Sequence, residues 1–136
     1  MLYFILFPAL IGVTMEDLKS KKIYDGVTLI NMLLALNFHL FFGDIKLCVI
    51  GLTAGILSVA FINLTRLQNL GGGDAKLMGM IGSFVGWKAA VLTIVIAFII
   101  DKLWKRHFKR ESCYPYSPYI TAGFILVTLC QKLILY

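Results

Sequence analysis

The stretch Gly71-Gly72-Gly73-Asp74-Ala75-Lys76 interrupts an otherwise apolar sequence, with long apolar segments on both sides of it. An ionisable side chain at the edge of a bilayer is costly, so it marks a functional site by default. Asp74 is therefore our first candidate catalytic residue. On spacing alone, a flexible turn with Asp74 as the N-cap of the next helix is an equally good interpretation. A second acid elsewhere in the chain is needed to favour the catalytic interpretation over the helix cap.

The composition is typical of a polytopic membrane protein. Of the 136 residues, 60% are hydrophobic and 15% are charged, and the mean hydropathy is +0.87. A soluble domain is nearer half apolar and a quarter charged. The length suits one membrane-embedded domain, residues 1–136. The net charge of +6 comes from bases in short loops between apolar runs, which indicates membrane topology and not nucleic-acid binding.

Apolar runs divide the chain into about six expected transmembrane segments, so we predict an all-α fold. Each long run approaches the roughly 20 residues that cross about 30 Å of hydrocarbon. A lone spanning strand would leave its backbone unpaired in lipid. The expected segments are 1–15, 26–43, 47–64, 75–86, a fifth that ends at 100, and a sixth that 115–119 opens, with Pro118 in its first turn, and that runs to 136. Polar loops are expected at 16–25, 65–73 and 101–111.

The apolar run 77–100 could be one long helix or two short ones that reverse near 83–88. Lysine and arginine concentrate on the cytoplasmic side of a membrane. Only the two-helix interpretation places the lysines of 19–22, Arg66, Lys76 and the basic cluster 102–110 on one face. It leaves the fourth helix too short to span at 1.5 Å per residue, with a glycine-rich loop before it. We therefore expect water to reach that loop, and both termini to lie outside the cytoplasm.

A second acid shares this face with Asp74. Asp17 ends the first expected segment, and Asp74 begins the fourth. Two carboxylates that share a proton can act as base and acid, because their repulsion raises one pKa. One then activates water and the other protonates the leaving group. The pair titrates as a unit, so we assign neither role to either residue.

The glycines before Asp74 have a separate expected role. They can adopt backbone angles that other residues avoid, and they let another backbone approach closely. A protease commonly holds its substrate extended, by strand-like backbone pairing. We therefore expect Gly72 and Gly73 to form a loop that admits the substrate beside the acid.

Three stretches of this sequence resemble the type IV prepilin peptidases, intramembrane aspartic proteases with a G-x-G-D motif. The stretch 71–78 is similar to the family's G-G-G-D-x-K-L core. The stretch 17–25, followed by Thr28-Leu29, is similar to its first-aspartate loop. The stretch 114–119, with Gly123, is similar to its late P-F-G-P-F-L-A-x-G motif. Their order and spacing agree over nearly the whole chain.

The resemblance implies cleavage of the short basic leader of a prepilin-like membrane protein, at the cytoplasmic face of the cell membrane. Asp17 and Asp74 would be the catalytic aspartates, and no cofactor or metal is implied. The loops that meet the substrate would be shaped by Gly71, Gly72, Gly73, Lys76, Asp25, Pro115 and Pro118. The chain shows no four-cysteine zinc domain of the larger bifunctional members, so we expect a peptidase without methyltransferase activity.

The sequence departs from the family pattern at three positions. Tyr24 replaces a proline, Asp25 replaces an asparagine, and Ser117 replaces a glycine. These changes concern loop geometry and the fine substrate specificity, and they leave the chemistry intact.

Several side chains keep two interpretations. Asp25 could be a third acid near the site or the N-cap of the next helix. Lys76 could lower a carboxylate pKa or extend toward the lipid headgroups. We expect Asp101 to balance the basic loop. The alternative function is a small proton- or cation-coupled transporter or pore subunit that uses the same acids, because broken helices also occur at transporter sites. A non-enzymatic assembly scaffold is a third possibility.

Overall fold

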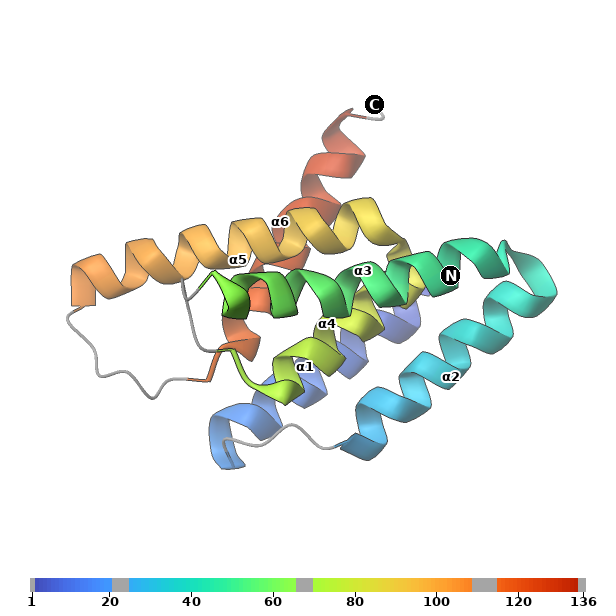
Figure 1. Ribbon diagram of the computed structural model, residues 1–136, viewed down its shortest axis with the longest axis horizontal. Coiled ribbons are helices and arrows are strands. Elements are labelled where there is room, and N and C mark those ends of the chain that lie inside the picture. Colours follow the sequence, from blue (N-terminus) through green and yellow to red (C-terminus); the bar gives the residue numbers. More distant parts are fainter. Residues whose placement is uncertain (1, 21–24, 66–69, 109–114, 135–136) are drawn as a thin grey trace.

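The computed structural model describes residues 2–20, 25–65, 70–108 and 115–134. These residues form six α-helices and no strand, which confirms the predicted all-α fold (Figure 1). The helices are α1 (Leu2–Ser20), α2 (Asp25–Phe42), α3 (Ile45–Leu64), α4 (Gly72–Val85), α5 (Trp87–Phe108) and α6 (Ser117–Ile134).

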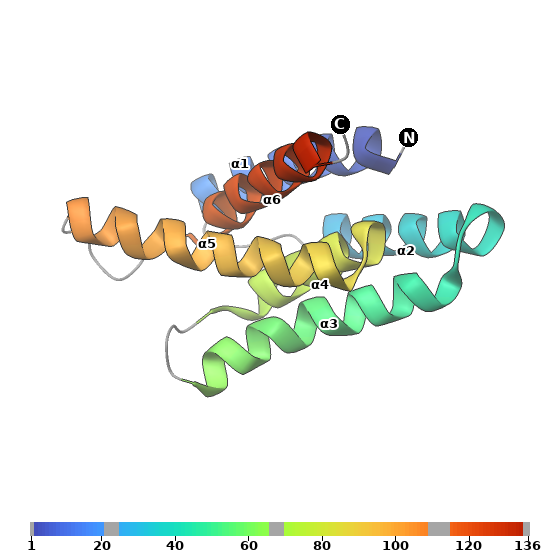
Figure 2. The ribbon, with the colours of Figure 1, turned by 90° about the horizontal axis from the view of Figure 1, so that it is seen from above.

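Successive helices alternate in direction, so their ends gather at two ends of the bundle. Figures 1 and 2 show the last turns of α1, α3 and α5 at one end, together with the first turns of α2, α4 and α6. The α2–α3 and α4–α5 connections, the first turn of α1 and the last turn of α6 lie toward the other end. We call the first of these the acid end, because it holds Asp17 in the last turn of α1 and Asp74 in the first turn of α4.

The apolar run 77–100 is broken into two helices, as predicted. α4 ends at Val85, α5 begins at Trp87, and Gly86 lies between them with φ of 91°. Side chains disfavour such a positive φ, and glycine does not. The N–H of Gly86 donates to the carbonyl of Gly82 at 2.8 Å, which closes the last turn of α4. This glycine therefore lets the chain reverse within one residue.

Three predicted boundaries were wrong in the same direction. Residues 16–20 continue α1, residues 72–73 begin α4, and residues 101–108 continue α5, where polar loops were expected. For 16–20 and 101–108, the reason is that charged side chains do not end a helix when they lie at a bundle end, where water can solvate them. Glycine and proline end helices far more effectively, and neither occurs within 16–20 or 101–108.

The short helix α4 is the centre of the bundle. Every residue from 77 to 84 is buried, and α4 packs against α2, α3 and α5. A Cβ atom on Gly51 of α3 would collide with the carbonyl of Gly82, and one on Gly55 would collide with the carbonyl of Met78. Small residues at such crossings let two backbones approach closely. Because protein surrounds α4, its short length leaves little backbone facing lipid.

The outer helices carry apolar surface instead of burying it. α2 and α3 are each long and apolar enough to cross a membrane, and only 22% of the 18-residue apolar window of each is buried. Phe42 and Leu64 are both 81% exposed. A core helix of a soluble protein would be mostly buried, so these faces fit a lipid environment.

Candidate active site

Asp74 is the third residue of α4, and its carboxyl group points back to the start of the helix. Gly71 is the N-cap, and its N–H donates to Oδ2 of Asp74 at 3.0 Å. Asp74 is therefore not the N-cap that one of the two interpretations required. A carboxylate at this position satisfies one of the unpaired N–H groups of the helix start and interacts favourably with the helix dipole. Only 9% of Asp74 is exposed.

The glycines do not adopt the unusual backbone angles that we expected of them. Gly72 and Gly73 are in the first turn of α4, and Gly71 has a φ of −75° that any residue can adopt. Among the described glycines, only Gly86 has a positive φ. A Cβ on Gly72 would meet no atom within 4 Å. The space beside Gly72 is thus open, as the expectation of a close approach by another backbone requires.

Asp17 is the second acid at this end of the bundle. It is 5% exposed and lies in the last turn of α1, a helix that contacts α4. α4 is not one of the helices long and apolar enough to span a membrane, and Asp74 lies in its first turn. The pKa of Asp74 is raised to about 6, chiefly by burial; the hydrogen bond from Gly71 lowers it, and the negative charge of Asp17 adds to the rise. The structure therefore brings the two predicted acids within electrostatic reach of each other.

Asp101 and Tyr116 join this cluster, and the sequence analysis missed both as site residues. Asp101 is 3% exposed and pairs with Lys105 at 2.9 Å, so it does balance one basic residue, but from a buried position. Burial, followed by the charges of Asp101 and Asp74, raises the pKa of the Tyr116 phenol. The phenol therefore keeps its proton and can act as a hydrogen-bond donor beside the acids.

Two hydroxyl groups at the start of α6 are buried and lack a partner in the described part of the chain. Neither Oη of Tyr116 nor Oγ of Ser117 has a hydrogen bond to any residue that the structure describes. Pro115 precedes this pair, and Pro118 follows it in the first turn of α6, as predicted. Buried hydroxyls are normally paired, so these two are available to a bound water or substrate. A tyrosine between two prolines at the acid end was the sequence signal that could have identified this pair.

Lys76 and Asp25 pair with each other at the surface and not with the buried acids. Nζ of Lys76 lies 2.6 Å from Oδ1 of Asp25, the first residue of α2. Their side chains are 47% and 70% exposed. The pair ties α2 to α4 beside the site without entering it.

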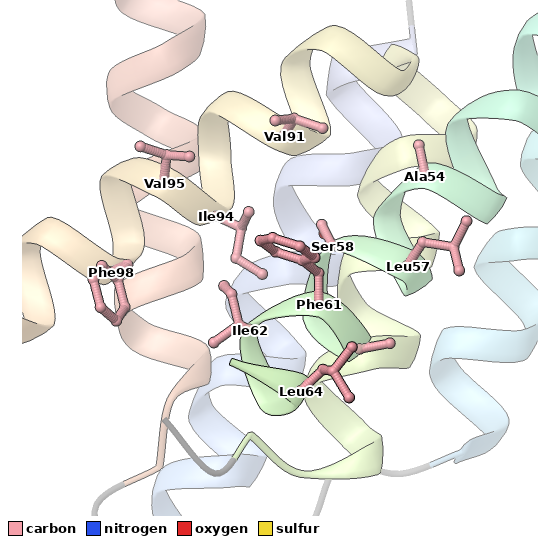
Figure 3. Close-up of a pocket in the computed structure, with 11 residues that line it drawn as sticks. Ala54, Leu57, Ser58, Phe61, Ile62, Leu64, Val91, Ile94, Val95 and Phe98 are labelled. Carbon is pink, nitrogen blue, oxygen red and sulfur yellow. The ribbon is translucent and has the colours of Figure 1, made fainter. Parts of the chain in front are cut away.

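An apolar groove of about 930 Å³ lies between α3 and α5 (Figure 3). Its wall is formed by Ala54, Leu57, Ser58, Ala60, Phe61, Ile62, Leu64, Val91, Ile94, Val95 and Phe98. None of these side chains is ionisable, so the groove is separate from the carboxylate chemistry.

In the described part of the chain, no three His, Cys, Asp or Glu side chains converge in a way that could hold a metal ion.

Comparison with known proteins gives a consistent result. The model of the type IV leader peptidase family matches residues 4–104. A protein named "Prepilin leader peptidase/N-methyltransferase" from Pectobacterium carotovorum subsp. carotovorum is 29% identical over 132 residues, which cover 88% of this chain and 47% of that protein. Proteins of the same name from Burkholderia pseudomallei (strain K96243) and Klebsiella pneumoniae are 27% identical over 128 residues and 33% identical over 100 residues. These matches cover 85% and 68% of this chain, and 41% and 44% of the relatives.

The chain thus spans less than half the length of these curated relatives. No solved structure matches it.

Proposed function

The chain belongs to the type IV leader peptidase family, and we propose that it is an aspartic endopeptidase that removes the leader peptide from a prepilin-like membrane protein. The observation that best supports this activity is the pair of buried carboxylates, Asp17 and Asp74, contributed by two distant segments at one end of the bundle. The pKa of Asp74, raised to about 6, keeps a proton on the pair up to about that pH. A shared proton is what an acid–base pair requires.

In the proposed reaction, the ionised carboxylate takes a proton from a water molecule, and the water oxygen attacks the scissile carbonyl carbon. The protonated carboxyl group gives its proton to the departing amide nitrogen as the C–N bond breaks. The products are a new carboxylate on the leader and a new amine on the mature protein. We assign the role of initial base to neither carboxylate in particular.

The surroundings of Asp74 suit an extended substrate. The open space beside Gly72 gives a peptide backbone room to approach the first turn of α4. The hydroxyl group of Tyr116 lacks a partner among the described residues and would donate to a substrate that enters beside it, whereas Ser117 is 0% exposed and stays behind it. A donor placed where a carbonyl oxygen develops negative charge stabilises the transition state. We therefore assign Tyr116 a place in substrate binding beside the two aspartates.

The chain is a membrane protein, and we propose that its six helices lie in the inner membrane with the acid end at the cytoplasmic face. The exposed apolar faces of α2 and α3 support the membrane location. Exposed Lys19, Lys105 and Arg106 lie at the acid end, and lysine and arginine concentrate on the cytoplasmic side. This orientation places the carboxylates where the basic leader of a membrane substrate emerges.

The proposal is tested by co-expressing the chain with a candidate prepilin and following leader removal on gels and by mass spectrometry. Asp17→Asn and Asp74→Asn should each reduce the rate by about 100-fold or more. Asp44→Asn is a matched control, because Asp44 is exposed at the opposite end and its side chain makes no capping hydrogen bond. Intact processing by either acid variant would overturn the two-aspartate mechanism. Proton flux in proteoliposomes that depends on both acids would support a transporter instead.

A further inference from the structure

Asn63, in the last turn of α3, forms two hydrogen bonds with the main chain of Leu70. Its Nδ2 donates to the carbonyl oxygen of Leu70 at 3.0 Å, and the N–H of Leu70 donates to its Oδ1 at 2.8 Å. One carboxamide side chain therefore pairs both main-chain groups of a single residue.

This pairing gives hydrogen-bond partners to the main-chain groups of Leu70, which need them. Leu70 is 8% exposed and immediately precedes the N-cap of α4, so its main-chain groups are outside the hydrogen bonding of that helix. Buried main-chain groups without partners are costly. Asparagine carries a carbonyl acceptor and an N–H donor side by side, which matches the two groups of one peptide residue.

The same contact leads directly to Asp74. Leu70 is bonded to Gly71, and the N–H of Gly71 donates to Oδ2 of Asp74 at 3.0 Å. The end of α3 is thus connected to the carboxylate through one side chain and two main-chain residues. Movement of Leu70 would turn the Gly71 N–H away from the carboxylate.

We propose that Asn63 is a positioning residue for Asp74, which holds Leu70 and Gly71 so that the Gly71 N–H stays directed at the carboxylate. This role rests on the proposed function in so far as Asp74 is catalytic. Asn63 itself need not touch the substrate. Its effect on Asp74 has two parts, the direction of the carboxyl group and the ease with which it ionises.

A purely structural role makes a different prediction. If Asn63 only tied the end of α3 to Leu70, its loss would lower stability and leave the titration of the folded protein unchanged. If it positions Asp74, its loss weakens the Gly71 hydrogen bond, which favours the ionised form, so Asp74 should titrate at higher pH. The other groups that face the cluster stay in place: Asp17 on α1, Asp101 on α5, Tyr116 before α6, and the surface pair Lys76–Asp25.

The test uses Asn63→Ala in the full chain, with Asn37→Ala as the matched control. Asn37 is an exposed asparagine whose Nδ2 bonds only within its own helix, to Leu33. The close packing of α3 on α4 at Gly51 and Gly55 does not involve Asn63, so we expect Asn63→Ala to fold. The pH profile of leader processing should move up by roughly one unit. Its kcat should fall about tenfold with little change in KM, because a misplaced catalytic group slows chemistry more than binding.

A second variant and a second readout keep the outcomes distinct. Asn63→Gln keeps both polar groups on a longer side chain, so its shift should have the same sign and be smaller. Carbodiimide labelling of Asp74 against pH, read by mass spectrometry, reports its protonation without any peptidase activity. The proposal would be overturned if the labelling profiles of Asn63→Ala and Asn63→Gln both superimposed on that of the wild type. If Asn63→Ala does not fold, the labelling profile of Asn63→Gln alone tests the proposal. A wild-type chain that processes no prepilin would instead overturn the proposed function, and the labelling would still test Asn63.

Discussion

Nζ of Lys76 lies 2.6 Å from Oδ1 of Asp25, so the lysine that follows Asp74 in the motif pairs with a different aspartate. Both side chains are largely exposed, and exposed ion pairs contribute roughly 0–1 kcal/mol to stability. We therefore expect Lys76→Met, Asp25→Asn and the double variant to unfold within about 1 kcal/mol of the wild type. A double-mutant cycle from thermal unfolding in detergent measures the coupling. A coupling energy well above that range would show that the pair is more important to the fold than its exposure indicates.

The protonation of Asp74 makes stability depend on pH. Its pKa is raised from 3.8 to about 6, first by burial, so the folded state binds the proton more tightly than the unfolded state does. The contribution of Asp74 to stability is therefore largest below pH 4, falls as the pH rises toward about 6, and then levels off. Asp74→Asn lacks this loss and should be more stable than the wild type at pH 7.5, by about 2–3 kcal/mol. Unfolding curves of the two proteins at pH 4 and 7.5 give the comparison. If wild type and Asp74→Asn lost the same stability between these two pH values, the raised pKa of Asp74 would be contradicted.

The same pKa predicts the shape of the activity profile. A reaction that needs one protonated and one ionised carboxyl group should be bell-shaped in pH. Its upper limb should fall near pH 6, where the second proton leaves the pair. Initial rates of leader removal by purified protein, measured from pH 4 to 8 on one prepilin, provide the test. A rate that stays level from pH 5 to 8 would exclude a shared proton.

Two glycines of α4 should respond in opposite ways to alanine. A Cβ on Gly72 meets open space, so Gly72→Ala should keep or raise stability by about 0.5–1 kcal/mol. If a substrate backbone occupies that space, the KM for leader removal should nevertheless rise. Gly82→Ala places a methyl group against the carbonyl of Gly51 and should destabilise the α3–α4 contact by about 1–3 kcal/mol or more. Wild-type kinetics for Gly72→Ala would remove this position from the substrate path.

The phenol of Tyr116 should contribute to rate and not to stability. Tyr116→Phe removes a buried hydroxyl that has no partner among the described residues, so the variant should unfold at the same temperature as the wild type or higher. Loss of a donor at the reacting carbonyl should lower kcat about 10- to 100-fold. Tyr119→Phe is the matched control, because the ring centroid of Tyr119 lies 5.8 Å from that of Tyr116. Unchanged kinetics for Tyr116→Phe would place its hydroxyl outside the reaction.

Much of the fold could be predicted from the pattern of apolar and charged residues. Apolar runs located the six helices, and the distribution of lysine and arginine favoured a break near residue 86 over a single long helix. The helix ends were less predictable, because charged residues such as Asp17 and Asp101 continue their helices at the end of the bundle. A hydropathy pattern records the environment of a side chain and not the hydrogen bonds of its main chain.

At the site, the glycine-rich stretch 71–74 likewise separates what the sequence predicts from what only the structure shows. By itself, the sequence determined that an acid stands beside three glycines in an apolar chain, and that Asp17 is a suitable partner in order and spacing. Only the tertiary structure decided that Asp74 bonds back to Gly71, that Asn63 holds Leu70, and that Asp101 and Tyr116 lie nearby. The Gly71–Asp74 and Asn63–Leu70 contacts span only three and seven residues, whereas Asp101 and Tyr116 come from segments far from Asp74. All of them depend on where helices begin, end and pack, which the apolar pattern does not encode. The site therefore combines an acid visible in the sequence with neighbours that only the packing supplies.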